Sequence, residues 1–102
     1  MEDRRVNERL DRARRYHAGI RQILLRDWDP IGVADVPEAQ DEYDNCIGKI
    51  YGMLIRYEPR HKLVEHLWLI ETEYMGLFGN RQRTEATVER LLSLRHEVER
   101  QG

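Results

Sequence analysis

Apolar residues recur along the chain at spacings of three and four, and the first run covers the opening quarter of the sequence. Its stripe consists of Val6, Leu10, Ala13, His17, Ile20 and Leu24, at intervals of 4, 3, 4, 3 and 4. Residues three and four apart share one face of an α-helix, because the helix repeats every 3.6 residues. The pattern therefore predicts a helix over 4–27 whose stripe, including His17, faces a core.

Three later runs have the same spacing and predict three more helices, over 36–57, 60–75 and 84–100. Their stripes are Tyr43, Ile47, Ile50, Leu54 and Tyr57, then Leu63, Leu67, Ile70 and Tyr74, then Val88, Leu91, Leu92, Arg95 and Val98. No alternating pattern typical of a strand competes with them. We therefore predict an all-α fold, an antiparallel four-helix bundle, in a single domain spanning residues 1–102.

Local signals mark where these helices begin. Asp35 and Glu38 have the spacing of a capping box, in which two side chains satisfy free backbone N–H groups, so the second helix is predicted to start at Asp35. Pro59 ends that helix and is acceptable as the first residue of the third. Thr84 is the predicted N-cap of the fourth helix.

Two glycines lie four residues apart within the second predicted helix. Gly48 and Gly52 share one face, and each costs about 1 kcal/mol of helix propensity relative to alanine. A compensating gain is expected where glycine lets another backbone come close. We therefore predict that a neighbouring helix, or the turn that begins at Trp28, packs closely against this face.

The longest irregular segment lies between the first two helices and opens with a turn that carries large apolar groups. This structural turn consists of Trp28, Asp29, Pro30, Ile31 and Gly32. Proline fixes its own φ and glycine accepts a positive φ, so both are typical of turns. We predict that Trp28 and Ile31 are buried beside Tyr43, and that the Asp29 carboxylate accepts backbone N–H groups of its own turn.

The same segment is acidic throughout, although the whole chain has a formal net charge of only −2. Residues 27–48 contain seven acids and neither lysine nor arginine. Five of these acids define what we call the acidic face: Asp35, Glu38, Asp41, Glu42 and Asp44. One interpretation is a solvated helix start that complements the helix dipole. The other is a docking surface for a basic protein partner, because complementary charge speeds association.

Catalytic and metal-binding patterns are weak in this sequence. Glu58 and His61 have the Glu-x-x-His spacing of di-iron bundles, but such sites need two copies and two more carboxylates. Cys46 lies within a predicted helix, where a buried structural thiol is the usual case. We therefore predict no metal, no cofactor and no catalytic residue. A small enzyme, with a pocket near His61 and His66, stays as an alternative.

Arginines fill the polar faces of the first predicted helix. They could form a basic stripe for nucleic acid, but acids such as Glu8 and Asp11 are interleaved with them and no recognition-helix signature accompanies them. A solvated, salt-bridged face is the favoured interpretation. A nucleic-acid-associated regulator that uses this helix is kept as a second alternative.

The targeting features are few. The single Cys46 excludes an internal disulfide and suits a reducing cytoplasm. No stretch is long and apolar enough for a membrane span, and no signal peptide is visible after Met1. A cytoplasmic location without membrane contact is expected, and the oligomeric state is left open.

Three short motifs resemble those of a group of small all-helical bacterial proteins. They are Trp28-Asp-Pro-Ile-Gly-Val33, Asp41-Glu-Tyr-Asp44 and Ile70-Glu-Thr-Glu-Tyr-Met-Gly-Leu77. The group resembles the Bacillus YugE-like domain of unknown function, and the likeness covers residues 20–77. It implies a helical fold and supplies no catalytic residues. In size and charge the chain is also similar to immunity partners of bacterial toxins. The favoured hypothesis is accordingly a non-enzymatic interaction protein, with a toxin as one candidate partner.

Overall fold

The computed structural model describes the backbone of residues 4–101 and the side chains of residues 7–100. Its helices are α1 (Arg4–Ile23), α2 (Asp44–Ile55), α3 (Arg60–Leu69) and α4 (Arg81–Gln101). Single π-helical turns extend α1 over Leu24–Trp28 and α3 over Ile70–Tyr74. No strand occurs in this part of the chain, so the all-α prediction is confirmed.

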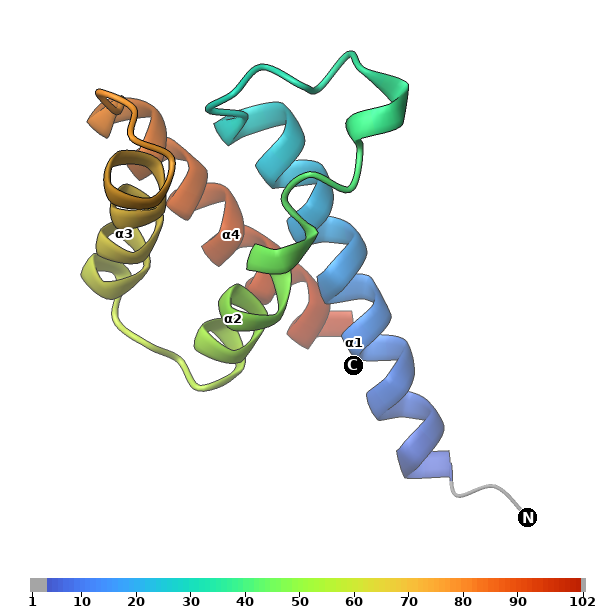
Figure 1. Cartoon of the computed structure of the whole chain (residues 1–102). Helices are drawn as coiled ribbons and strands as arrows, with labels where there is room; N and C mark the ends of the chain where they lie inside the picture. Colours follow the sequence, from blue (N-terminus) through green and yellow to red (C-terminus); the bar gives the residue numbers. More distant parts are fainter. Residues whose placement is uncertain (1–3, 102) are drawn as a thin grey trace.

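The two long helices, α1 and α4, form the centre of the bundle (Figure 1). The shorter α2 packs on α1, and α3 packs on α4. The core between them holds apolar side chains from all four helices and from the segment before α2, the largest being Trp28, Tyr16 and Tyr43. The acidic segment that connects α1 to α2 arches over the C-terminal end of α1 (Figure 1).

The predicted core stripe of α1 is wrong in its first half. The Leu10 side chain is 50% exposed and His17 is also exposed. Figure 1 shows the N-terminal turns of α1 extending beyond the other helices, which accounts for the exposure of Leu10, whereas His17 lies beside α2 with its ring 5.2 Å from that of Tyr51. The buried stripe begins later and consists of Tyr16, Ile20, Leu24, Leu25 and Trp28. Val6 lies outside the residues whose side chains are described.

The predicted starts of two helices are also wrong. The second helix begins at Asp44, and the region of the expected capping box holds only a single 3₁₀ turn, Pro37–Ala39, without a side-chain cap. The fourth helix begins at Arg81, where the Asn80 side-chain oxygen accepts the N–H of Arg83 at 3.0 Å. Asparagine is as good a cap as threonine. Thr84 is fully buried inside the helix instead.

Within the described residues, the tight helix–helix contact at a glycine occurs not at the two predicted but at Gly19 of α1, where a side chain and not a backbone comes close. A β-carbon built on Gly48 meets nothing within 4 Å, and one on Gly52 meets only the flexible Arg56 side chain. A β-carbon on Gly19 would lie 2.5 Å from the Leu94 side chain of α4. The tight contact is therefore between α1 and α4, which form the centre of the bundle.

These contacts predict opposite effects for two matched substitutions. Gly48→Ala should raise the free energy of unfolding by about 1 kcal/mol, because alanine is the better helix former and the site is open. Gly19→Ala should lower it by about 1–3 kcal/mol, because Leu94 must move. Urea unfolding of both variants measures the difference. Equal shifts of the same sign would contradict the placement of the tight α1–α4 contact at Gly19.

Candidate protein-interaction surface

The acidic segment starts from a buried anchor at the end of α1. The Trp28 side chain is 1% exposed, and its ring lies 5.5 Å from that of Tyr43, centroid to centroid. The next residue, Asp29, adopts a left-handed conformation with φ of 34°, and its N–H donates to the Leu24 carbonyl at 2.7 Å. Aspartate is among the few residues besides glycine that accept this conformation readily. It ends the helix and turns the chain.

The Asp29 carboxylate then holds the turn together. One oxygen accepts the Val33 N–H at 2.8 Å and the Tyr43 hydroxyl at 2.8 Å, and the other accepts the Ala34 N–H at 3.0 Å. The Tyr43 hydroxyl accepts the N–H of Ile31 at 3.2 Å. The predictions for Trp28, Asp29 and Tyr43 are thus confirmed.

The prediction for Ile31 is wrong. Its backbone is bound by Tyr43, but its side chain is 42% exposed. Trp28 enters the core from the end of the helix, and Val33 packs partly buried against that core on the other side of the turn. Ile31 is left on the outer side of the turn.

The bonds to Asp29 predict a pH dependence of stability. Burial alone raises the pKa of this carboxyl, but the hydrogen bonds from Val33, Tyr43 and Ala34 together outweigh it and lower the pKa. Because the folded-state pKa is lowered, the stabilisation is present above the unfolded value of about 3.9 and is lost as pH falls below it. Asp29→Asn should therefore lower the free energy of unfolding at pH 7 by about 1–3 kcal/mol, and this deficit should shrink below pH 4.

Urea unfolding of wild type and Asp29→Asn between pH 3 and 7 measures that deficit. Asp35→Asn is the matched control, because Asp35 is exposed and its side chain has no hydrogen bond within the described region. It should differ little from wild type throughout. An Asp29→Asn deficit that stays constant over this pH range would contradict the role of the ionised carboxylate.

Gln40 fixes the rest of the segment. Its side-chain N–H₂ group donates to the carbonyl oxygens of Ala34 and Val36, each at 2.9 Å, and lies 3.4 Å from that of Val33. These bonds hold the segment in an irregular conformation in place of the helix predicted from Asp35. This role of Gln40 was not predicted, because nothing in the local pattern distinguishes it from a surface glutamine.

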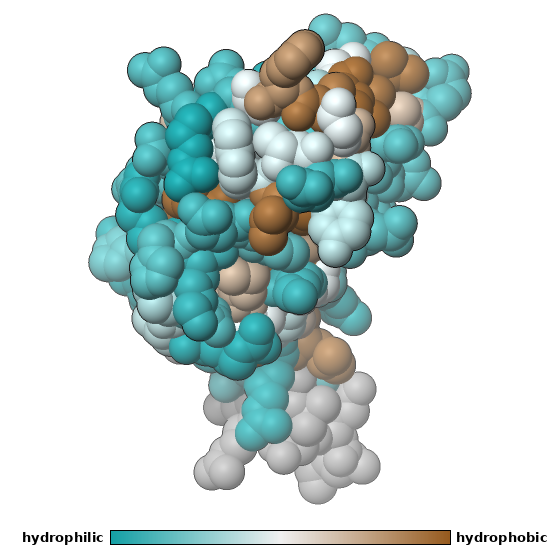
Figure 2. All heavy atoms as spheres, turned by 60° about the vertical axis from the view of Figure 1, so that its left-hand side comes forward, coloured by the Kyte–Doolittle hydropathy of each residue, from teal (hydrophilic) through white to brown (hydrophobic). Residues whose placement is uncertain are grey.

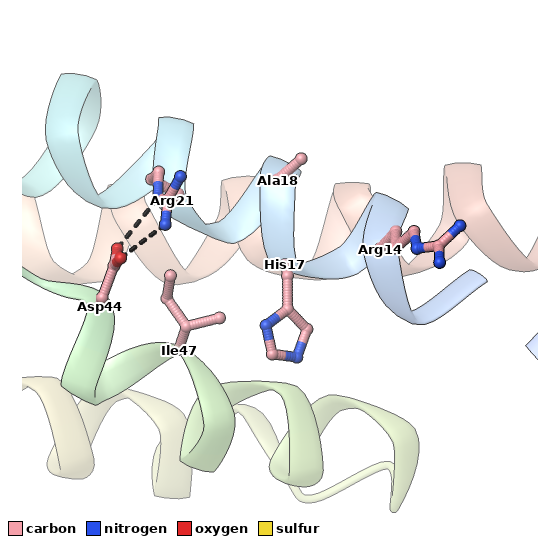
Figure 3. Close-up of a pocket in the computed structure, with 6 residues that line it drawn as sticks. All are labelled: Arg14, His17, Ala18, Arg21, Asp44 and Ile47. Carbon is pink, nitrogen blue, oxygen red and sulfur yellow. Dashed lines mark hydrogen bonds and ion pairs between the residues drawn. The ribbon is translucent and has the colours of Figure 1, made fainter. Parts of the chain in front are cut away.

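The structure divides the acidic face into two groups. Four members, namely Asp35, Glu38, Asp41 and Glu42, are exposed, and the structure shows no ion pair or hydrogen bond for their side chains within the described residues. The fifth, Asp44, is partly buried and accepts two hydrogen bonds from Arg21 of α1, at 2.5 and 2.9 Å (Figure 3). Asp44 therefore attaches the start of α2 to α1, and its charge is already compensated.

Apolar side chains accompany the free carboxylates. Val36 is 40% exposed, close to the exposure of Ile31 on the same segment. The loop between α3 and α4 lies at the same end of the molecule and carries the exposed Phe78 (Figure 1). Figure 2 shows hydrophobic side chains gathered at this end, on a face that is otherwise mostly hydrophilic. Such mixed surfaces are typical of protein interfaces.

The residues weighed for catalysis and metal binding differ in their burial. No group of three or more His, Cys, Asp or Glu side chains that could hold a metal occurs among the described residues. Burial raises the pKa of the partly buried Cys46 thiol, which disfavours the reactive thiolate. Burial and the nearby Lys49 lower the pKa of His66, whereas His61 is exposed.

The arginines of α1 are only partly engaged with acids. Arg12 pairs with Glu99 of α4 at 3.5 Å, and Arg15 pairs with Asp11 at 2.6 Å. The structure shows no such partner for Arg9 or Arg14 within the described residues. Arg14, His17 and Arg21 line a shallow hollow of about 330 Å³ between α1 and α2 (Figure 3). The basic surface is therefore concentrated toward the N-terminal half of the helix.

Comparison of the chain with protein-family models, with curated proteins and with solved structures gives no match. Within the described residues, none of the helices is long and apolar enough to cross a membrane. The functional interpretation therefore rests on the geometry of the chain itself.

Proposed function

We propose that this protein is a non-enzymatic interaction protein that binds a basic protein partner through the acidic face. One observation carries the proposal. Four exposed carboxylates, Asp35, Glu38, Asp41 and Glu42, have no hydrogen-bond or ion-pair partner among the described residues, and they lie on an irregular segment that the bonds of Asp29, Tyr43 and Gln40 fix in place.

A fixed acidic surface has two physical advantages for binding. Its negative potential attracts a basic partner over a distance of about 8–10 Å at physiological salt and speeds the encounter. Because the backbone is already ordered, docking loses less conformational entropy than it would on a mobile loop. Ile31 and Val36 supply apolar area that a partner can cover.

A bacterial toxin with a basic substrate-binding surface is one partner of this chemistry. Nucleases commonly present such surfaces, because they bind phosphates, and an acidic protein can occlude them. With such a toxin as its partner, the protein is an immunity protein in a bacterial cytoplasm. The chain is similar to such immunity proteins in size and charge.

The experiment is capture of partners from the native host, followed by association kinetics over a salt series. Asp41→Asn combined with Glu42→Gln should slow association about tenfold at low salt and leave dissociation almost unchanged. The difference should disappear at high salt. Glu73→Gln with Glu97→Gln removes the same charge from exposed sites elsewhere and should have a smaller effect.

A substitution of Asp44 is expected to act differently, because Arg21 already compensates the charge of Asp44. Asp44→Asn should lower stability through the lost α1–α2 ion pair and should change the association rate less than the Asp41 and Glu42 pair does. If the captured partner associates with the double variant as fast as with wild type at low salt, the acidic face is only a solvated surface and the proposal is wrong.

A further inference from the structure

We infer that the basic partner of the acidic face is a second copy of this chain, paired with the first about a two-fold axis. The inference rests on the proposed function in one respect, because it uses the same acidic face. It adds the identity of the partner and the surface that the partner contributes.

That surface is an exposed face of α1 beside α2, on which Arg21 pairs with Asp44 and the His17 ring lies 5.2 Å from the Tyr51 ring, centroid to centroid. It consists of Leu10, Arg14, His17 and Arg21, at intervals of 4, 3 and 4, which we call the α1 face. All four side chains are exposed, and Leu10 has an apolar side chain that the bundle leaves uncovered. Figure 3 shows Arg14, His17 and Arg21 along one edge of the helix, beside a hollow whose lining includes Ala18 and Ile47.

Charge is distributed unevenly along this face. At one end, neither Arg14 nor Arg9 of the same helix has an acidic partner among the described residues. At the other end Arg21 is paired with Asp44, and Asp41 lies within its electrostatic range. Glu42 is the next residue along the chain, and Asp35 and Glu38 precede both on the segment that arches over the C-terminal end of α1 (Figure 1). The surface is therefore basic toward the N-terminus of α1 and acidic toward its C-terminus.

A surface with this polarity is complementary to itself. A two-fold axis that crosses it near Arg21 makes the two α1 helices antiparallel, so that Arg14 of each copy faces Asp41 and Glu42 of the other. Both contacts form at once, and the pair closes as a dimer without extending into a filament. Leu10 of each copy can then cover the exposed Ile31 or Val36 of the other. The apolar groups match as well as the charges.

The size of the molecule is compatible with such a dimer. A helix rises about 1.5 Å per residue, so Arg14 lies about 20 Å from the end of the first helical segment at Trp28. The whole molecule extends 51 Å along its longest axis. Its accessible surface is 6983 Å², and a stable interface of standard size covers about 800 Å² of each partner. The net charge of −2 gives little overall repulsion between copies.

Sedimentation equilibrium on the purified chain at 50 and 500 mM salt tests the inference. Wild type should be dimeric at low salt and dissociate as salt rises, because the contacts are ionic. Arg14→Glu should raise the dissociation constant of the dimer about a hundredfold, because both symmetry-related contacts change. Asp41→Arg with Glu42→Arg should do the same. Lys62→Glu reverses a charge on the exposed side of α3 and should leave the dimer unchanged.

Mixing the two weakened variants gives the decisive result. In the mixed pair, the glutamate introduced by Arg14→Glu in one variant faces the two introduced arginines of the other, so this contact has both charges reversed. The second contact is the native one between Arg14 and the acids at 41 and 42. A heterodimer should therefore form, although neither variant dimerises alone. Circular dichroism and urea unfolding check that both variants are folded. A wild type that is monomeric at low salt, or a mixture that stays monomeric, would overturn the inference.

The outcomes for the two proposals are distinguishable. In one outcome the wild type is monomeric, but a foreign partner captured from the host still binds Asp41→Asn with Glu42→Gln more slowly than wild type. This outcome would overturn the inference that the partner is a second copy, and the proposed function would stand. A wild-type dimer that the same double variant does not weaken would overturn both uses of the acidic face.

Discussion

Trp28→Ala is expected to lower the free energy of unfolding by about 3–5 kcal/mol, the range for deleting a buried aromatic side chain. The indole is among the largest fully buried groups of the core and packs against the Tyr43 ring. It also lies where α1 passes into the acidic segment. Its Nε1–H has no hydrogen-bond partner within the described residues, so the loss comes from packing and not from a broken hydrogen bond.

The second tryptophan supplies the matched control. Trp68 is only partly buried, and the Arg81 guanidinium lies 5.2 Å from its ring centre. Trp68→Ala should therefore cost less, about 1–2 kcal/mol. Urea unfolding at pH 7 measures both variants. A loss below about 1 kcal/mol for Trp28→Ala would contradict the assignment of Trp28 as the anchor of the segment.

Glu71→Ala is expected to lower the free energy of unfolding by about 3 kcal/mol, because it breaks a buried, hydrogen-bonded ion pair. The Glu71 side chain is fully buried and accepts the Asn80 N–H and the Arg83 guanidinium, each at 2.8 Å. Asn80 in turn caps α4. Removal of the carboxylate leaves the Arg83 charge, about one third exposed, without its partner and frees the residue that begins the last helix.

An exposed glutamate tests whether burial is the reason for this effect. Glu65 pairs with Arg81 at 3.0 Å, but both side chains are exposed. Glu65→Ala should cost at most about 1 kcal/mol. Glu71→Gln keeps one acceptor for Asn80 and should fall between the two. Equal losses for Glu65→Ala and Glu71→Ala in urea unfolding would show that the buried pair has no special role.

The helical architecture could be predicted because periodicity records which face of each helix is buried. Ile47, Ile50 and Leu54 occupy core positions in α2 as their spacing predicts. The pattern cannot record where neighbouring helices end. Leu10 has the right spacing for burial, but α1 extends beyond the helices that would cover it. The difference depends on tertiary contacts that no local signal in α1 contains.

The charged residues of the acidic face could be predicted from the sequence, but the bonds that fix its segment could be predicted only in part. The block of acids without a base is visible in the sequence, and so is the turn chemistry of Asp29. The bonds of Gln40 and the pairing of Asp44 with Arg21 join residues 4–7 and 23 positions apart, which local rules do not connect. Because these bonds could not be foreseen, a helix start with a capping box was predicted at Asp35, where the structure has an irregular loop.

Amide hydrogen exchange of Val33 and Ala34 tests most directly the central claim, that the acidic segment is a fixed part of the fold. Both N–H groups donate to the Asp29 carboxylate. At pH 7 they should exchange much more slowly than in an unstructured peptide, and Asp29→Asn should remove most of that protection. Exchange of both amides in wild type at the rate of an unstructured chain would contradict the claim.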